Sequence, residues 1–272
     1  MNTTQSFGDL VRDWRGRRRM TQMDLALEAE LSSRHMSFLE TGRSRPSREM
    51  VLRLAERLEM PLRDRNQLLT AAGFAPVYPE RSLDDPALAA GRRAVDLILT
   101  GHEPHPALAV DRRWTLLAAN GSAMDLMGGI DPTLMTGPVN MLRISLHPAG
   151  LAPRILNLSE WRAHILERLR HDLAASADPA LAELLAEISA YPAPPTAVGR
   201  PQGADYGGVA IPLRLASEAG PLSFIGTTTV FGTPVDVTLS ELMLETFFAA
   251  DDHTARVMSE LATARAARAS AA

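Results

Sequence analysis

Four polar side chains occur close together in one short segment: Ser33, Arg34, His35 and Ser37. A guanidinium near the start of a helix can donate two hydrogen bonds to the edge of a guanine, a contact worth about 1 to 3 kcal/mol of discrimination between bases. The serines and His35 can make smaller contacts to bases or phosphates, although such residues on a surface are often only solvated. These four residues, named here the reading face, therefore predict recognition of a DNA sequence, with Arg34 as the main base contact.

A second set of side chains is suited to the phosphate backbone. Gln22 lies near the start of a predicted helix, and Thr41, Arg43 and Arg45 follow the segment of the reading face. Contacts of this type hold a protein in register on the duplex but carry no sequence information. We therefore predict that Gln22, Thr41, Arg43 and Arg45 bind phosphates.

The reading face requires two helices joined by a turn. Thr21 can cap the first helix together with Asp24, the turn passes through Glu30 and Leu31, and Ser32 can cap the second helix. The spacing of the apolar residues places one inner surface across both helices. This surface consists of Leu25, Ala26, Ala29, Leu31, Met36 and Leu39. The pattern is that of a helix-turn-helix.

Three more helices complete the predicted N-terminal domain. Phe7, Leu10, Val11 and Trp14 recur at the spacing of an amphipathic first helix. After the reading face, one helix is capped by Ser47 and a further helix starts at Pro61. Five short helices within residues 1–76 predict an all-α domain.

The composition agrees with a division of the chain into two domains. Its 272 residues are long for one ordinary domain. All 28 basic residues are arginine; residues 1–73 have 13 of them against 10 acids, and the other residues have 15 against 22. The basic excess therefore accompanies the helix-turn-helix, as DNA binding requires. Because there is no cysteine, disulfides, thiolate metal sites and cysteine nucleophiles are excluded. We expect a cytoplasmic protein without a membrane partner, since no apolar run is long enough to span a bilayer.

The second part of the chain predicts an α/β domain with an antiparallel sheet. Residues 77–104 are expected to be a linker with a connecting helix from Ala87 to Leu99, and residues 105–272 to be the domain. A hairpin is predicted within Pro106–Ala119. Helices are predicted for Leu158–Ala174, after Asp178 and from Thr254, with a tail after Arg265 that frays; strands are predicted for Val209–Ala216, Leu222–Phe231 and Glu241–Ala250.

Two stretches resemble known families. Residues 7–76 are similar to the xenobiotic-response-element (Cro/λ-repressor-like) helix-turn-helix family, above all in the stretch LSSRHMSFLETGRSRPSREM. The stretch from Ser145 to Leu173, SLHPAGLAPRILNLSEWRAHILERLRHDL, resembles the MmyB-like ligand-binding domain. The resemblance implies that the helix beginning at Ser32 enters the major groove and that the C-terminal domain has a PAS-like fold. It also implies that this domain can bind an apolar small molecule, with a fatty acid as the known ligand type.

The candidate ligand-binding residues are methionines and a group of polar residues. Met124 and Met127 could line an adaptable pocket, but methionine is also ordinary core filler. Polar anchors for an acidic ligand could come from a group around Trp161; a hydrogen-bond network that fixes the loop explains the same residues. The group consists of Arg143, His147, Arg154, Asn157 and Trp161.

Three functions remain as alternatives. The first is a homodimeric transcriptional regulator that binds a double-stranded DNA operator and responds to a small apolar ligand. In the second, the C-terminal domain only dimerises the DNA reader. The third is an enzyme fused to a DNA-binding domain, and it is disfavoured: no nucleophile or phosphate-loop motif occurs, and Pro104 interrupts the pair His102 and His105 that could suggest metal ligands. We expect no cofactor other than a possible bound fatty acid.

Overall fold

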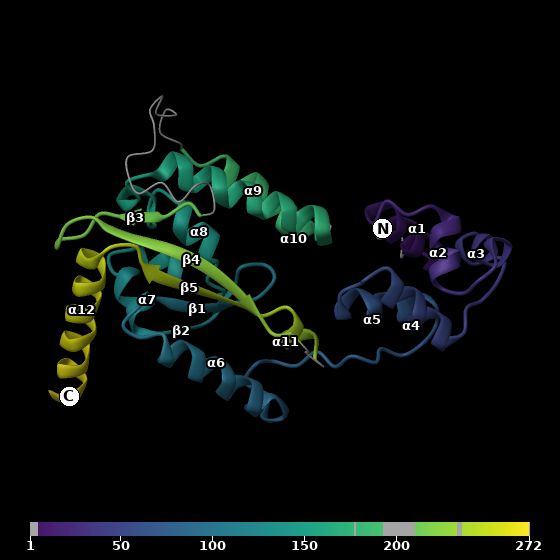
Figure 1. The fold of residues 1–272 in the computed structure, drawn as a ribbon, viewed down its shortest axis with the longest axis horizontal. Coiled ribbons are helices and arrows are strands. Elements are labelled where there is room, and N and C mark those ends of the chain that lie inside the picture. Colours follow the sequence, from purple (N-terminus) through teal and green to yellow (C-terminus); the bar gives the residue numbers. More distant parts are fainter. Residues whose placement is uncertain (1–4, 177, 193–209, 233–235, 272) are drawn as a thin grey trace. The chain divides into compact units, whose positions relative to one another are not determined.

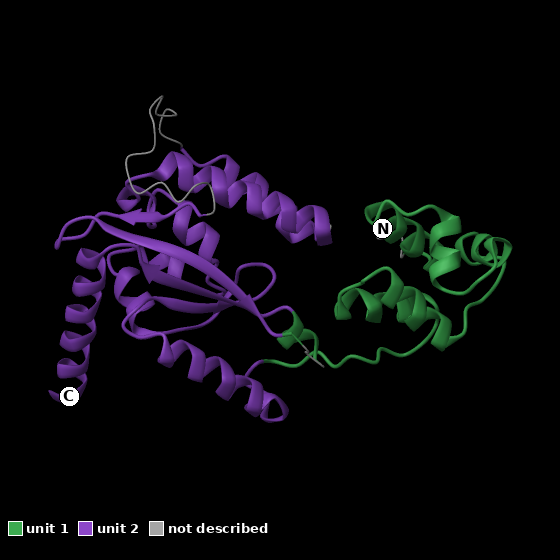
Figure 2. Cartoon of the chain, in the orientation of Figure 1, with its two compact units in different colours: residues 1–82, 232–240 green, residues 83–231, 241–272 purple. Residues whose placement is uncertain are grey.

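The computed structural model describes residues 5–176, 178–192, 210–232 and 236–271. The chain separates into two compact units, coloured differently in Figure 2. Unit 1 comprises residues 1–82 and 232–240, and unit 2 comprises residues 83–231 and 241–272. Residues 77–104, predicted as a linker with a connecting helix, are thus divided between the two units.

Unit 1 contains the five predicted helices of the helix-turn-helix domain, and its helix starts are explained by side-chain caps. Thr21 and Asp24 form the predicted capping box, while Ser32 and Ser47 accept hydrogen bonds from the first turns of their helices. The helices are α1 (Phe7–Arg17), α2 (Gln22–Glu28), α3 (Ser33–Glu40), α4 (Arg48–Arg57) and α5 (Leu62–Ala71).

A single apolar core holds these helices together. Leu25, Met36 and Leu39 are fully buried, as the apolar pattern of the helix-turn-helix predicts. Trp14 packs in the same cluster. Helix α1 approaches the end of α3 closely at Gly8, where a Cβ atom would lie 2.2 Å from the carbonyl oxygen of Glu40. Only glycine therefore permits this packing of α1 against the reading helix.

Unit 2 is an α/β domain with an antiparallel sheet, as predicted. The described strands are β1 (Ala107–Val110), β2 (Leu116–Ala119), β3 (Leu213–Leu215), β4 (Leu222–Val230) and β5 (Met243–Ala249). They form a five-stranded sheet in the order β2-β1-β5-β4-β3, so β5 is central.

Helices cover both faces of the sheet (Figure 1). The described helices of unit 2 are α6 (Ala89–Gly101), α7 (Gly121–Leu126), α8 (Met141–Leu146), α9 (Leu158–Ser176), α10 (Pro179–Ser189) and α12 (Asp252–Ala271), with short 3-10 turns at Pro86–Leu88, Pro132–Met135 and Ala152–Arg154. Side chains alternate along β5. Glu245 and Phe247 face the helices α8 and α9, whereas Phe248 contacts the ring of His102 after α6.

Some predicted boundaries are corrected by the structure. Strand β3 begins at Leu213, and Val209, where the strand was predicted to begin, lies outside the described residues. The tail after Arg265 is helical to Ala271, because alanine and arginine are strong helix formers. Arg265 also forms ion pairs with Glu103 and Asp125, which fix α12 to the loop after α6 and to α7.

Helix α11 (Val237–Ser240) was not predicted from the sequence; it belongs to unit 1 although it connects two strands of unit 2. Asp236 is fully buried and pairs with Arg81 at 3.2 Å. Thr238 Oγ1 donates to the carbonyl oxygen of Arg81 at 2.5 Å, and the Val237 N–H donates to that of Pro79 at 2.9 Å. The chain therefore passes between the units three times, at residues 82–83, 231–232 and 240–241.

The turn of the helix-turn-helix yields a prediction about stability. Glu30 has φ 57°, a left-handed conformation that costs a residue with a side chain about 1 to 2 kcal/mol. Its ion pair with Arg53 is long, at 3.8 Å, and exposed, so little is lost with it. We expect Glu30→Gly to stabilise α2 and α3 by about 1 kcal/mol, measured by hydrogen exchange of their amides in the full chain. Glu28→Gly, the same charge change inside α2, should lower that stability; stabilisation by both would contradict the explanation.

Candidate functional site

The reading face lies on the solvent side of α3. Ser33 and Arg34 are exposed, and His35 and Ser37 are half-buried. The guanidinium of Arg34 lies 5.4 Å from the centre of the Phe38 ring, which restrains it above the helix surface. All four predicted residues are thus at least partly accessible on α3, and the Arg34 guanidinium is exposed beside the Phe38 ring.

The loop after α3 presents two further cations. Gly42 has φ 71°, and the Arg43 N–H donates to the carbonyl oxygen of Phe38 at 2.8 Å, which folds the loop back on the helix. Arg43 and Arg45 are exposed. Within the part of the chain that the structure describes, no ion pair joins Arg34, Arg43 or Arg45 to a carboxylate. Their charges are thus available to a polyanion.

Two of the predicted phosphate ligands are already engaged. Thr41 Oγ1 donates to the carbonyl oxygen of Ser37 at 2.7 Å, so its hydrogen points back to the helix. Gln22 Nε2 donates to a carboxylate oxygen of Glu40 at 3.1 Å. Because phosphate oxygens only accept hydrogen bonds, contacts from these side chains require a second amide hydrogen of Gln22 or the release of the Thr41 bond.

The carboxylate of Glu40, at the end of α3, fixes this helix against α1 and α2. Its residue is 4% exposed, and Arg15 on α1 donates to both oxygens at 2.8 and 3.2 Å. Gln22 adds the bond from α2, and Arg12 donates to the Glu40 carbonyl at 3.0 Å. A buried carboxylate without such partners is costly, so α1, α2 and α3 are stable only in this mutual arrangement.

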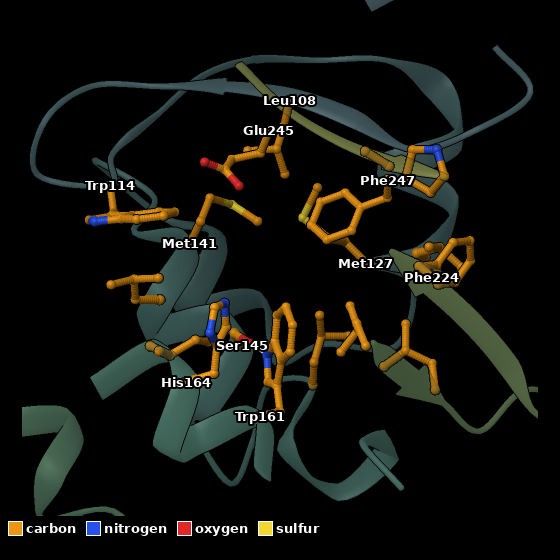
Figure 3. A pocket seen from close by; sticks show the side chains of 18 of the residues that line it. Leu108, Trp114, Met127, Met141, Ser145, Trp161, His164, Phe224, Glu245 and Phe247 are labelled. Carbon is orange, nitrogen blue, oxygen red and sulfur yellow. Dashed lines mark hydrogen bonds between the residues drawn. The ribbon is translucent and has the colours of Figure 1, made fainter. Parts of the chain in front are cut away.

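Unit 2 encloses a cavity of about 110 Å³ between β5 and the helices α8 and α9. In Figure 3, Met127 and Met141 extend into the middle of this space, with Trp161, His164 and Ser145 on the helix side and Glu245 and Phe247 on the sheet side. Most of the wall is apolar. It includes Leu108, Trp114, Leu126, Leu142, Leu151, Ile165, Leu213, Leu215 and Phe224.

One end of the cavity carries an ion pair. Arg168 on α9 donates to both carboxylate oxygens of Glu245 on β5, at 2.8 and 3.2 Å. Thr228 donates to the same carboxylate at 2.9 Å, and the guanidinium lies 4.3 Å from the centre of the Trp114 ring. Glu245 is 6% exposed, so it forms a bidentate, nearly buried pair with the Arg168 guanidinium within the wall.

The other polar groups of the cavity are uncharged. Trp161 Nε1 donates to Ser145 Oγ at 2.9 Å, which leaves the hydroxyl hydrogen of Ser145 to donate elsewhere. Burial lowers the pKa of His164 below its ordinary value, and the charge of Arg168 lowers it further. His164 is therefore a neutral imidazole at pH 7, with one donor and one acceptor.

The predicted ligand-binding residues are separated by the structure. Met127 and Trp161 line the cavity. Met124 lies outside the lining and is 46% exposed. The four polar candidates, Arg143, His147, Arg154 and Asn157, are also absent from the lining, which corrects their predicted place at the ligand.

Each of these polar side chains is already bonded to its own neighbourhood. Arg143 forms a bidentate pair with Glu187 at 2.6 and 2.7 Å, and Arg154 donates to the carbonyls of Leu126 and Gly128. Asn157 donates to the Pro212 carbonyl and accepts from the Arg214 N–H, while His147 Nδ1 accepts from the Ala149 N–H. These local bonds favour the alternative explanation, in which the four side chains fix the structure around them.

Four polar residues of the cavity were missed by sequence reasoning: Ser145, His164, Arg168 and Glu245. His164 and Arg168 lie one and two helical turns after Trp161, on the apolar stripe of α9. A polar residue on a buried stripe is a signal that could have drawn attention to them. The partner of Arg168 is 77 positions away in the chain, so only the fold brings it there.

Neither a metal cluster nor a membrane helix is present among the described residues. His102 Nε2 lies 3.0 Å from the carbonyl oxygen of Phe247, and no group of three His, Asp or Glu side chains that could hold a metal occurs in the described chain. No described helix has both the length and the apolar character to cross a bilayer.

Comparison with protein families decides the identity of the chain. Residues 92–261 match the MmyB-like transcription regulator ligand binding domain. The chain belongs to the MmyB-like transcription regulators. Residues 6–68 match a helix-turn-helix domain, so this regulator is a DNA-binding transcription regulator with a ligand-binding domain.

Other comparisons add little to the description of the regulator. No curated protein matches its sequence. The solved structure of an RNA-binding Light-Oxygen-Voltage Receptor is 14% identical, with a TM-score of 0.26. The match covers 97% of this chain and spans 65% of the length of that chain, and a TM-score this low supports no conclusion about function.

The Arg143–Glu187 pair predicts a dependence of stability on pH. Hydrogen bonds from Arg143 hold the pKa of Glu187 at about 2, below the ordinary 4.5. The stabilisation is thus fully present above pH 4.5 and is lost as the pH falls through about 2. Since both side chains are over one third exposed, we expect Arg143→Ala to cost only about 1 kcal/mol at pH 7.

Urea denaturation at pH 7 and pH 3 measures this difference, which should shrink by more than half at the lower pH. Arg170→Ala, which removes an exposed pair with Glu167, should cost less and serves as the control. An equal effect of Arg143→Ala at both pH values would show that the ion pair is not its cause.

Proposed function

We propose that this regulator is a cytoplasmic homodimer that binds a palindromic operator. Binding of a small apolar molecule, such as a fatty acid, in the cavity raises or lowers its affinity for that operator. The observation that carries the proposal is the apolar cavity within the ligand-binding domain of a chain whose other unit presents an accessible reading face. General operator geometry supports the dimer in this proposal: two half-sites about one helical turn apart double the contacts of a single short reading helix.

The charges of unit 1 support the DNA part of the proposal. Arg34, Arg43 and Arg45 lie on and directly after α3 without carboxylate partners among the described residues, so a phosphate backbone would be their first strong counter-ion. The major groove accepts a helix, and Arg34 stands in the first turn of α3, where side chains reach base edges.

The cavity supports the ligand part. An apolar cavity of about 150 Å³ can bind a molecule of the size of benzene, so about 110 Å³ holds a short hydrocarbon segment. A longer chain requires side chains to move. Met127 and Met141 extend into the space, and their unbranched thioethers can adopt other rotamers at low cost. Occupancy of the cavity is thus coupled to the position of the surrounding elements.

The chain itself offers a route from the cavity to unit 1. Glu245 and Phe247 on β5 face the cavity, and only Glu241 and Leu242 separate β5 from α11. Within unit 1, α11 is attached by the buried Asp236–Arg81 pair and by the Thr238 hydrogen bond. A ligand that shifts β5 would therefore act on a segment that is bonded into the DNA-binding unit, provided that it prefers one of the two positions.

The reading face is tested by a pair of arginine variants. An operator is first selected from random DNA with the wild-type regulator. Arg34→Ala should lose about 1 to 3 kcal/mol of discrimination between this operator and its single-base variants. Arg43→Ala should weaken binding to all sequences alike and lower the slope of log affinity against log salt by about 1. Both are measured by titration over a salt series.

Arg57→Ala removes the same charge from α4, outside the predicted surface, and should change neither quantity as much. If Arg34→Ala and Arg43→Ala both behave like this control, the assignment of the reading face is wrong.

The coupling is tested at Thr238. Thr238→Val keeps the shape of the side chain but removes the hydrogen bond to the Arg81 carbonyl. We expect the variant to bind operator and probe like the wild type, while the change of operator affinity caused by the probe falls by at least about half. Thr263→Val, which removes an equivalent hydroxyl from α12, should leave the response intact. The probe is n-octanol, and operator affinity is titrated with and without it.

Native mass spectrometry of the same samples counts subunits and bound molecules. A wild-type dimer whose operator affinity does not respond to n-octanol or to C8–C14 fatty acids would favour the alternative, in which the C-terminal domain only dimerises the DNA reader. A response that survives in Thr238→Val would refute the route through α11 but not the sensor function.

A further inference from the structure

Strand β4 is paired on one side only along its second half. On the side of β3, the pairing ends at Phe224, which lies opposite Leu213, whereas β4 continues to Val230 (Figure 1). On the side of β5, the pairing is regular as far as Val230. Among the described residues, no strand pairs with the other side of Gly226–Val230, and all five of these residues are exposed. This segment is named here the β4 edge.

The register shows which backbone groups point out of the β4 edge. Along a strand between antiparallel neighbours, successive residues bond alternately to one neighbour and to the other. The carbonyl oxygen of Ser223 accepts from the Ala250 N–H at 2.9 Å, so the odd-numbered residues of β4 bond towards β5. The N–H and C=O groups of Gly226, Thr228 and Val230 therefore point out of the open side.

The β4 edge lacks three features that commonly keep an open strand from pairing. Its sequence is Gly-Thr-Thr-Thr-Val, without a charged residue or a proline, and its register against β5 has no bulge. The threonines and the valine are β-branched, which favours extended structure, and Val230 is 61% exposed. A strand edge of this kind is a template for pairing with another strand.

The β4 edge is complementary to itself. If a two-fold axis passes beside Thr228, the edges of two copies run antiparallel, with Thr228 opposite the partner's Thr228 and Gly226 opposite the partner's Val230. These are the residues whose backbone groups point outwards, so their pairs would exchange about six hydrogen bonds. Gly226 has no side chain to obstruct the exposed valine opposite it. Because the edge is uncharged, the axis brings no like charges together.

We propose that the β4 edge is the dimer contact of this regulator, where it pairs with the β4 edge of a second copy to form one sheet across both ligand-binding domains. The inference rests on the homodimer of the proposed function and names its surface. It also places the contact beside the cavity, because the Thr228 hydroxyl donates to Glu245 at 2.9 Å and accepts from Arg168 at 2.8 Å. These two charges form an ion pair and add no net charge near the axis.

The first test removes one outward-pointing donor. Val230→Pro loses the N–H that faces the partner, whereas proline is tolerated at a strand edge that faces solvent. Its dimer dissociation constant, measured by analytical ultracentrifugation of the full chain without DNA, should rise by about tenfold or more, since each dimer loses two hydrogen bonds. Val230→Thr keeps the N–H and the branched shape, and it should change the constant by less than about threefold. Circular dichroism checks that both variants are folded.

The second test reads the register and does not depend on the proline variant. The chain has no cysteine, so a single engineered cysteine can form a disulfide only with another copy. In the proposed pairing, Thr227 lies opposite the partner's Thr229 with about 4.5 Å between Cα atoms, but about 7 to 8 Å from the partner's Thr227, which is too far for a disulfide. Under mild oxidation, a mixture of Thr227→Cys and Thr229→Cys should therefore form mixed dimers at least about tenfold faster than either variant forms its own. Leu97→Cys, at an exposed position of α6, replaces Thr229→Cys in the control mixture and should show no such gain.

The two tests separate the dimer contact from the dimer itself. An unchanged dissociation constant in folded Val230→Pro, or mixed disulfides that form no faster than those of the control mixture, would overturn the β4 edge as the contact, while a homodimer joined by another surface remains. If the wild-type chain is a monomer in native mass spectrometry both alone and on its operator, the proposed homodimer is wrong and this inference falls with it.

Discussion

A buried carboxylate must have a cation beside it, and this constraint organises both units of the regulator. In unit 1, Glu40 at the end of α3 is bound by Arg15 from α1 and by Gln22 from α2. The reading helix can therefore take only the position in which these partners converge. Gly8 reinforces the constraint, since it lets α1 approach the Glu40 carbonyl more closely than any residue with a Cβ atom would allow. The bonds on the buried side of α3 thus determine which side of the helix is accessible.

Unit 2 meets the same constraint with the same chemistry. Asp178 caps α10, and although burial alone would raise its pKa, hydrogen bonds from Arg113 and the charge of Arg112 lower it overall. At the cavity, Arg168 binds Glu245 with its fork and stacks on Trp114 with its flat face. A lysine could not do both, because its ammonium is neither planar nor bidentate. A chain whose basic residues are all arginine is well suited to bury acids beside aromatic rings.

The parts of this structure that could be predicted from sequence are those fixed by neighbours in the chain. Caps at Thr21, Ser32, Ser47, Asn120 and Asp178 mark the helix starts because each side chain bonds to an amide two or three residues away. Apolar periodicity then assigns the core of unit 1. The ligand anchors could not be found in this way: Arg143 stands in a promising apolar stretch, but its partner Glu187 lies 44 positions further on. Likewise, nothing local shows that α11 leaves unit 2 to bond with residues 79–81.

The size of the cavity sets the scale of any response. An unfilled cavity costs about 24 cal/mol for each Å³, so 110 Å³ corresponds to about 2 to 3 kcal/mol of the stability of unit 2. A molecule that fills the cavity can stabilise the state that binds it by this free energy, and it stabilises no other state. Because a ligand can shift an equilibrium by no more than its difference in affinity for the two states, filling the cavity would by itself change operator affinity by at most roughly 30- to 150-fold. Methionines at the centre of the wall lower this limit further, since side chains that move to fill the space reduce the cost of leaving it empty. A sensor built on such a cavity would accept ligands of different length, but the change in operator affinity that a ligand can cause would be smaller.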